Sequence, residues 1–242
     1  MRILAFESSA KAASVALLED GVLLAESFVN NGKTHSATLM PMAERILLDC
    51  DMTARDLDCI AVAKGPGSFT GVRIGVAAAK GLAWAAEKPC CGVSTLEGMA
   101  YQLRHLRGTI CPVMDARRSQ VYNALFASDG QHLRRITEDR AISIEELKKD
   151  LEKSEKPIFL VGDGSRLCYN TLDQGLTLVY PPMHLEMQRA SGVAMAAEVL
   201  VAQGHTVTPE QLTPNYLRLS QAERERLARL QTSDQFKLKG DS

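Results

Sequence analysis

The segment KGPGSFTGVRIG, residues 64–75, constrains the fold more than any other part of the chain. The apolar run over 59–63 that precedes it predicts a buried strand, and the alanine-rich run over 70–86 that follows predicts a helix. Glycines permit backbone angles that other residues resist, and Ser68 or Thr70 can cap the helix. Such a strand, turn and helix start either hold an anion at the helix N-terminus or form a purely structural turn. The segment has neither a Walker pattern nor G-x-G-x-x-G.

Composition indicates a globular protein with no marked bias. The 242 residues suit one large or two small domains, and the net charge of −1 marks no overall basic surface for nucleic acid. No apolar run reaches the roughly 20 residues that span a bilayer, and the start MRILAFE reads as a strand rather than a signal peptide. The six cysteines form no C-x-x-C pair and most lie in apolar runs, so we expect a reduced, cytoplasmic protein without membrane contact.

The order of predicted elements occurs twice along the chain. The first series comprises strands over 2–6, 13–18 and 22–29, a helix over 34–50, a strand over 59–63, the helix over 70–86, a strand over 90–93 and a helix over 94–105 that opens with a Ser94–Glu97 capping box. The second comprises strands over 109–114, 120–127 and 132–136, a helix over 143–153, a strand over 157–161 and a helix over 191–203.

Both series therefore contain the order β-β-β-α-β-α, which the first extends by one strand and one helix. This predicts an α/β protein of two actin-like, ribonuclease-H-like β-β-β-α-β-α halves of the ASKHA superfold. We expect the first half over 1–107, with the Gly-Pro-Gly turn, and a smaller second half over 108–206. A C-terminal tail over 207–242 follows, with a Pro-x-Tyr-Leu-Arg segment and a frayed end.

Several short motifs are spread along the chain: Phe6-Glu7-Ser8-Ser9, Ser14-Val15-Ala16-Leu17, His35-Ser36, Leu39-Met40-Pro41, the segment 64–75, Ala79-Lys80-Gly81-Leu82, Val93-Ser94-Thr95-Leu96-Glu97, Pro112-Val113-Met114-Asp115-Ala116-Arg117-Arg118, Val121-Tyr122 and Pro214-Asn215-Tyr216-Leu217-Arg218. In this order they resemble the motifs of the bacterial TsaB family, also called YeaZ. The match at 64–75 is the most specific, and the region 128–190 matches only loosely.

The resemblance implies a role in tRNA threonylcarbamoyladenosine synthesis, as partner of the catalytic subunit TsaD and helper in recruiting the ATPase TsaE. Whether the chain pairs with itself when TsaD is absent stays open, and we expect indirect or weak contact with tRNA. The related TsaD family holds a metal with two histidines, and Thr95 and Met99 stand at those positions here. Hydroxyl and thioether groups are poor ligands for iron or zinc, so we expect no catalytic residue, no metal and no cofactor.

A vestigial nucleotide site is a second expectation from the superfold. Kinases of this fold grip phosphate with a glycine-containing hairpin after the first strand, whereas this chain has no glycine there, which hinders the approach of the backbone to phosphate. We expect weak or no ATP binding at this site, with a plain surface turn as the alternative reading. The candidate residues are Glu7, Ser8, Ser9, Gly65, Gly67, Ser68 and Asp115.

The helices over 34–50 and 70–86 carry apolar and small side chains nearly all round, which requires burial on more than one face. Either both simply pack on the sheet, or part of each forms a subunit interface, and we favour the interface. The candidate residues are Leu39, Met42, Ala43, Ile46, Gly71, Gly75 and Ala79. Two other functions stay open: an active small-molecule kinase, and a glycoprotease-like metalloenzyme, which lacks the expected histidine pair.

Overall fold

The computed structural model describes residues 1–172 and 175–218 of the chain. Within these ranges the first half is built on a five-stranded sheet in the order β3-β2-β1-β4-β5. β1 pairs with β2 and β2 with β3 in antiparallel fashion, whereas β1, β4 and β5 are parallel. The strands are β1 (Arg2–Glu7), β2 (Ala13–Glu19), β3 (Val22–Val29), β4 (Cys59–Ala63) and β5 (Cys90–Val93).

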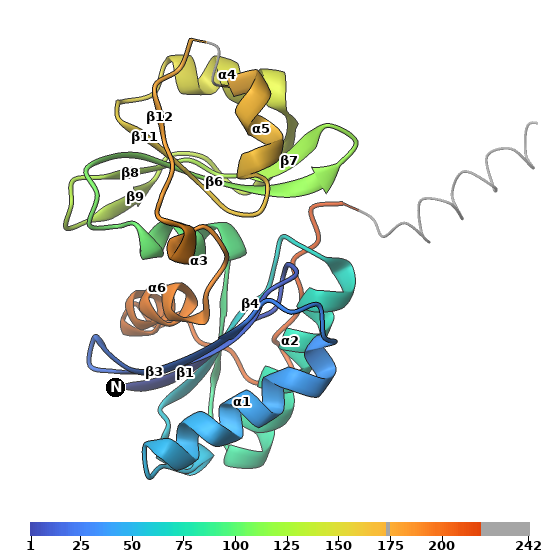
Figure 1. The fold of residues 1–242 in the computed structure, drawn as a ribbon. Helices are drawn as coiled ribbons and strands as arrows, with labels where there is room; N and C mark the ends of the chain where they lie inside the picture. The colour runs from blue at the N-terminus through green and yellow to red at the C-terminus, as the bar shows by residue number, and fades with distance from the viewer. Residues whose placement is uncertain (173–174, 219–242) are drawn as a thin grey trace, which may run out of the picture.

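Helices cover both faces of this sheet (Figure 1). α1 (His35–Asp49) and α2 (Phe69–Ala86) pack side by side on one face, where they close a large apolar core. α6 (Ala190–Ala202) covers the other face and also packs on α3 (Thr95–Gln102), which leads toward the second half. The short η1 (Ala54–Asp56) precedes β4.

The second half repeats this topology. Its main path runs β10-β7-β6-β11-β12, again with three antiparallel strands followed by parallel neighbours, and a β8-β9 hairpin is attached to β6. The elements are β6 (Gly108–Arg117), β7 (Gln120–Asn123), β8 (Phe126–Ser128), β9 (Leu133–Arg135), β10 (Arg140–Ser143), α4 (Ile144–Glu152), β11 (Ile158–Val161), α5 (Ser165–Leu172), β12 (Leu178–Val179) and η2 (Met183–Leu185). The matching strand orders confirm the predicted fold of two actin-like halves.

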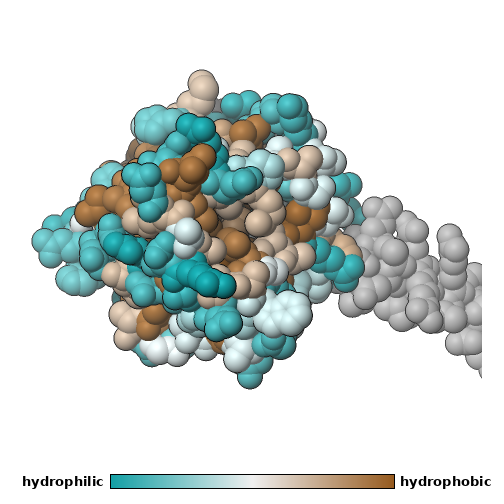
Figure 2. All heavy atoms as spheres, turned by 90° about the horizontal axis from the view of Figure 1, so that it is seen from below, coloured by the Kyte–Doolittle hydropathy of each residue, from teal (hydrophilic) through white to brown (hydrophobic). Residues whose placement is uncertain are grey.

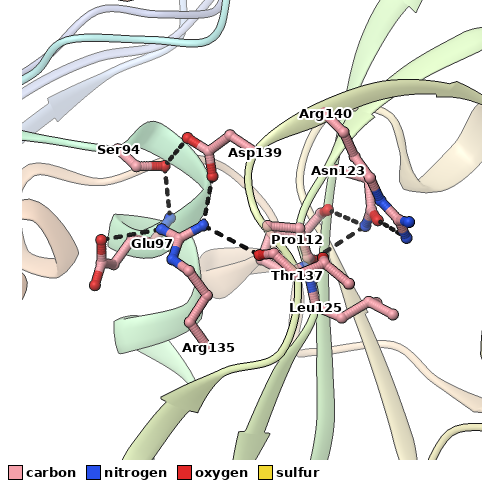
Figure 3. Close-up of polar contacts among 10 residues, drawn as sticks. Ser94, Glu97, Pro112, Asn123, Leu125, Arg135, Thr137, Asp139 and Arg140 are labelled. Atoms are coloured by element: carbon pink, nitrogen blue, oxygen red, sulfur yellow. Dashed lines mark hydrogen bonds and ion pairs between the residues drawn. The ribbon is translucent and has the colours of Figure 1, made fainter.

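The prediction of one strand over 120–127 is wrong, because β7 and β8 pair with different parts of β6. Pro112 lies between those parts and has no N–H to donate to a ladder. The Asn123 side chain donates instead to the Pro112 carbonyl oxygen at 2.9 Å (Figure 3). The predicted third strand over 132–136 is β9, which lies off the main path, and the unpredicted β10 takes its place.

The sequence predicts that the helix over 191–203 belongs to the second half, but α6 packs on the first sheet. Its buried face consists of small residues that fit closely against the strands, and the Ala190 N–H donates to the Ser14 hydroxyl at 2.7 Å. The sequence contains no signal for this crossover, because an alanine-rich helix suits either sheet. The division at 107 and 206 stays a prediction. None of the helices in the described ranges is long and apolar enough to cross a membrane.

The contact between α3 and α6 depends on glycine. A Cβ atom on Gly192 would lie 2.2 Å from the Gly98 carbonyl oxygen, so Gly192→Ala should destabilise the protein by about 1–3 kcal/mol. Gly81 is the matched control, since a Cβ there meets nothing within 4 Å. Gly81→Ala should stabilise the protein by about 0.5–1 kcal/mol. Urea unfolding of both variants measures the difference, and equal effects at the two sites would contradict the packing argument.

Candidate functional site

The Gly-Pro-Gly turn brings two stretches of backbone into direct contact. The turn follows β4, and the β1–β2 connection lies against it, with the Ser68 N–H donating to the Ser9 carbonyl oxygen at 2.6 Å. A Cβ atom on Gly67 would lie 2.5 Å from that oxygen, and one on Gly71 would lie 2.1 Å from the Ser8 carbonyl oxygen. Glycine is required at both positions because any side chain would separate the two stretches.

The β1–β2 connection therefore occupies the start of α2. The Ser8 hydroxyl donates to the Gly71 carbonyl oxygen at 2.9 Å, and a Cβ on Gly75 would lie 2.4 Å from that hydroxyl oxygen. Ser68 caps the helix, accepting from the Gly71 N–H at 3.3 Å. One side of the first turn of α2 thus packs on this chain's own backbone, while Ser68 and Thr70 are exposed. The turn therefore has a structural role, and anion binding at the helix start stays a prediction.

One buried acid, Glu7, and one half-buried acid, Asp163, lie beside this contact. Glu7 ends β1, is almost fully buried, and accepts the Ser9 N–H at 2.6 Å. Burial raises the pKa of Glu7 to about 7, with a further contribution from the charge of Asp163. Burial also raises the pKa of Asp163, which follows β11 in the second half and is influenced by Asp115. The predicted nucleotide-site residues therefore gather between the halves, and Asp163 joins them.

The positions that correspond to metal ligands in the TsaD family lie inside α3. Thr95 and Met99 are both buried, and the Met99 sulfur packs against the backbone at Gly162. Among the described residues, no group of three or more His, Cys, Asp or Glu side chains is arranged to hold a metal ion.

A C-terminal strap, residues 207–218, crosses α2 and the Gly-Pro-Gly turn. It begins where Val207 pairs with Cys90 of β5, and the Asn215 N–H donates to the Lys64 carbonyl oxygen at 2.6 Å. A Cβ on Gly65 would lie 2.4 Å from the Asn215 carbonyl oxygen. Because Gly65 has no side chain, the backbone of the strap can lie directly against the turn. The Pro-x-Tyr-Leu-Arg motif is recognisable in the sequence, but its contact with this turn was not predicted.

An ion-pair network joins the two halves at α3 (Figure 3). Arg135 of β9 lies between Glu97 and Asp139, at 3.0 and 2.6 Å, and the Ser94 hydroxyl donates to Asp139 at 2.6 Å. The predicted capping box is therefore only half formed. Ser94 does cap α3, accepting from the Glu97 N–H at 3.3 Å, but the Glu97 carboxylate binds Arg135 instead of returning to the helix start. The sequence predicted a pair of Ser94 and Glu97, but it did not predict their partners Asp139 and Arg135.

A cleft of about 630 Å³ borders this network and the strap. The Lys64 side chain enters it across Gly92, where a Cβ would lie 2.8 Å from the lysine Cδ. The acidic side chains Glu97 and Asp139 that line the cleft are engaged by Arg135.

The seven residues predicted to form a partner interface lie in the chain's own core. Leu39, Met42, Ala43 and Ile46 of α1, and Ala79 of α2, are buried in the cluster between these helices and the sheet. Gly71 and Gly75 are buried against the β1–β2 connection. The small residues Gly71, Gly75 and Ala79 do recur at i, i+4 spacing along α2, but the helix face that carries them is buried against the chain's own sheet and β1–β2 connection.

The opposite faces of the same helices are exposed and partly apolar. On α2 they carry the small residues Ala77 and Gly81 and, 73% exposed, Trp84. On α1 they carry Met40 and, 65% exposed, Leu48. We call these five residues the α1–α2 outer face. Seen from below, the end of the molecule that carries α1 and α2 shows apolar areas among polar ones (Figure 2).

Comparisons with known proteins agree with this fold. The family model described as TsaD, tRNA N6-adenosine threonylcarbamoyltransferase, matches residues 24–226. The chain is 35% identical over 92% of its length to the tRNA threonylcarbamoyladenosine biosynthesis protein TsaB of Bacillus subtilis, 96% of which is covered. It is 34% identical to TsaB of Escherichia coli, with 90% and 95% covered. The solved structure of YeaZ from Pseudomonas aeruginosa matches with a TM-score of 0.75 and 26% identity, covering 89% of this chain and 99% of that one.

Glu7 gives the site a measurable pH dependence. Its pKa is raised in the folded state, so the folded protein holds a proton that the unfolded chain has released, between the ordinary value of 4.5 and about 7. The Glu7 contribution is therefore most favourable below pH 4.5 and is lost as pH rises to about 7, by about 3 kcal/mol at most. Glu7→Gln should remove this component. Unfolding free energies measured from pH 4.5 to 8 should show it as a difference from wild type.

Exposed Glu44 of α1 serves as the control, and Glu44→Gln should leave the wild-type pH profile in place. If Glu7→Gln also left the profile unchanged, the pKa of Glu7 would be the same in the folded and unfolded chain, and the argument from burial would be wrong.

Proposed function

The chain belongs to the TsaB family of tRNA threonylcarbamoyladenosine biosynthesis proteins, and we propose that it is the non-catalytic partner of the transferase TsaD. The observation that carries the proposal is the α1–α2 outer face, which leaves apolar and small side chains exposed on two adjacent helices. Small residues let another backbone approach closely, and exposed apolar area of this kind favours association. We infer that TsaD docks there.

The absence of catalysis from this chain is a separate inference. Thr95 and Met99 replace the histidine ligands that the TsaD resemblance implies, and both are buried in α3. The start of α2 is occupied by the β1–β2 connection, which supports weak or no nucleotide binding. By this proposal the chain completes or stabilises the TsaD active site, and the pair recruits the ATPase TsaE. In isolation, the same outer face would let two copies of the chain pair.

The two alternative functions draw no support from these contacts. A kinase would need an open phosphate hairpin, whereas Ser8 and Ser9 pack directly on α2. A glycoprotease of this superfamily would need the metal pair that Thr95 and Met99 replace. ATP turnover by the purified chain, or stoichiometric tightly held iron or zinc, would favour one of them.

Reconstitution tests the proposed function directly. The chain is mixed with TsaD of the same organism, and threonylcarbamoyl transfer to tRNA is measured with TsaE, ATP and the activated threonylcarbamoyl donor present. Transfer should require both subunits, and neither should support it alone. Transfer by this chain in the absence of TsaD would show that it is itself the enzyme.

Docking on the outer face is tested by a charge at Gly81. A side chain there meets nothing within 4 Å, so Gly81→Glu should leave the fold intact. Burying an unpaired carboxylate costs several kcal/mol, and about 1.4 kcal/mol is tenfold in affinity. The variant should therefore bind TsaD at least about a hundredfold more weakly in size-exclusion co-elution and titration, with its melting temperature unchanged or raised.

Ala202→Glu on α6 is the control, because it places the same charge on an exposed helix position on the opposite face of the sheet. It should bind TsaD normally. Gly75→Glu should instead unfold the chain, since its Cβ would contact Ser8. Normal co-elution of Gly81→Glu would place the interface elsewhere.

A further inference from the structure

Four arginines and two aromatic rings form a continuous strip from α2 to the β6–β7 turn. The Phe69 and Tyr216 rings stack with centroids 4.7 Å apart, and the Arg73 guanidinium lies 3.8 Å from the Phe69 centroid. Two residues beyond Tyr216, Arg218 donates to the Ala116 carbonyl oxygen at 2.6 Å. The strap thereby joins the first half to the second, directly beside the turn that carries the remaining two arginines. We call this set the arginine strip: Phe69, Arg73, Arg117, Arg118, Tyr216 and Arg218.

The charge of the strip is not compensated by carboxylates of the described chain. Arg73 uses its Nε to donate to the Tyr216 hydroxyl at 2.7 Å, and Arg218 binds a neutral carbonyl. Arginines elsewhere, such as Arg135 and Arg189, are paired with carboxylates. The acid nearest in sequence to Arg117 and Arg118 is Asp115, whose carboxylate accepts the backbone N–H of Arg117 at 2.6 Å. The strip thus concentrates positive charge on a protein whose net charge is −1.

The turn that presents two of these arginines has an unusual backbone. Arg117, Arg118 and Ser119 have φ values of 63°, 57° and 55°, all in the left-handed region that glycine and asparagine occupy more readily. All three residues are exposed, so no packing of their side chains explains their presence. Strained backbone of this kind is often associated with a functional site.

We propose that the arginine strip binds a single-stranded segment of tRNA, with the arginines on phosphates and Tyr216 stacked on a base. This inference rests on the proposed function, because it supplies the RNA. Single-stranded nucleic acid is bound by basic grooves combined with aromatic rings on which bases stack. Tyr216 is 39% exposed and lies beside Arg73, whose guanidinium has no carboxylate partner in the described chain. An acidic protein could also bind the arginines, but binding it would not require an exposed aromatic ring beside them, whereas stacking of a base does.

The test measures binding of a fluorescein-labelled RNA stem-loop, with a single-stranded loop, to the complex with TsaD. The strip variant carries both Arg117→Gln and Arg118→Gln. It removes two charges without introducing a β-branched residue into the turn. The control variant Arg107→Gln, Arg134→Gln removes two exposed charges near the opposite end of β6, neither of them in an ion pair within the described chain. Fluorescence anisotropy is followed over a range of salt concentrations.

Each phosphate contact with a single strand contributes about 0.7 to the slope of log affinity against log salt. The strip variant should therefore lower that slope by about 1.4 and weaken binding by about 25-fold at roughly 0.1 M salt. Tyr216→Ala should weaken binding by about tenfold with little change in slope, because a stacked base is lost rather than a charge. The control variant should match wild type in both measures.

Failure of this inference is distinguishable from failure of the proposed function. If the complex forms and modifies tRNA while the strip variant binds RNA with wild-type affinity and slope, the inference is wrong. It is also overturned if the strip variant binds RNA normally but no longer co-elutes with TsaD, because the strip would then be a protein interface. If no complex with TsaD forms at all, the proposed function fails, and RNA titration of the chain alone still tests the strip by the same slopes.

Discussion

The close approach of the β1–β2 connection to the start of α2 is the contact on which the site depends. It requires glycine at positions 67, 71 and 75, because a Cβ at each would lie within 2.5 Å of Ser8 or Ser9 atoms. The contact fixes α2 against the sheet at Gly71 and Gly75, while Ser68 and Thr70 at its N-terminus are exposed. It also buries Glu7 and brings it near Asp163 of the other half. One steric requirement thus sets the position of the helix and accompanies the burial that raises the pKa of Glu7.

Three separate connections then hold the halves in place. α6 crosses back to cover the first sheet, Arg135 binds Glu97 and Asp139 across α3, and Arg218 of the strap binds the end of β6. The Arg135 network is half-buried, where breaking one partner leaves a charge uncompensated. The relative position of the halves therefore depends on residues that lie far apart in sequence, and the arginine strip exists only because the strap joins them.

The sequence predicted the local elements well and the long-range contacts poorly. Apolar periodicity located the strands of the first half, and the Gly-Pro-Gly turn located α2, since these signals lie within one element. The pairing of β8 with the start of β6, the crossing of α6 and the binding of Tyr216 to Phe69 join distant segments. No local pattern encodes such partners. The Thr95 and Met99 positions came from resemblance alone, because neither residue type signals a lost metal site by itself.

The two faces of α2 show where pattern reasoning reaches its limit. Gly71, Gly75 and Ala79 recur every fourth residue, and so do Ala77 and Gly81 on another face of the same helix. The first set is buried against the chain's own turn and sheet, and the second is open to solvent. Small residues thus recur at the same spacing on a buried face and on an exposed face, so the sequence pattern cannot distinguish the two. The physical distinction is the occupied space beyond the Cβ: 2.4 Å to the nearest atom at Gly75, and nothing within 4 Å at Gly81.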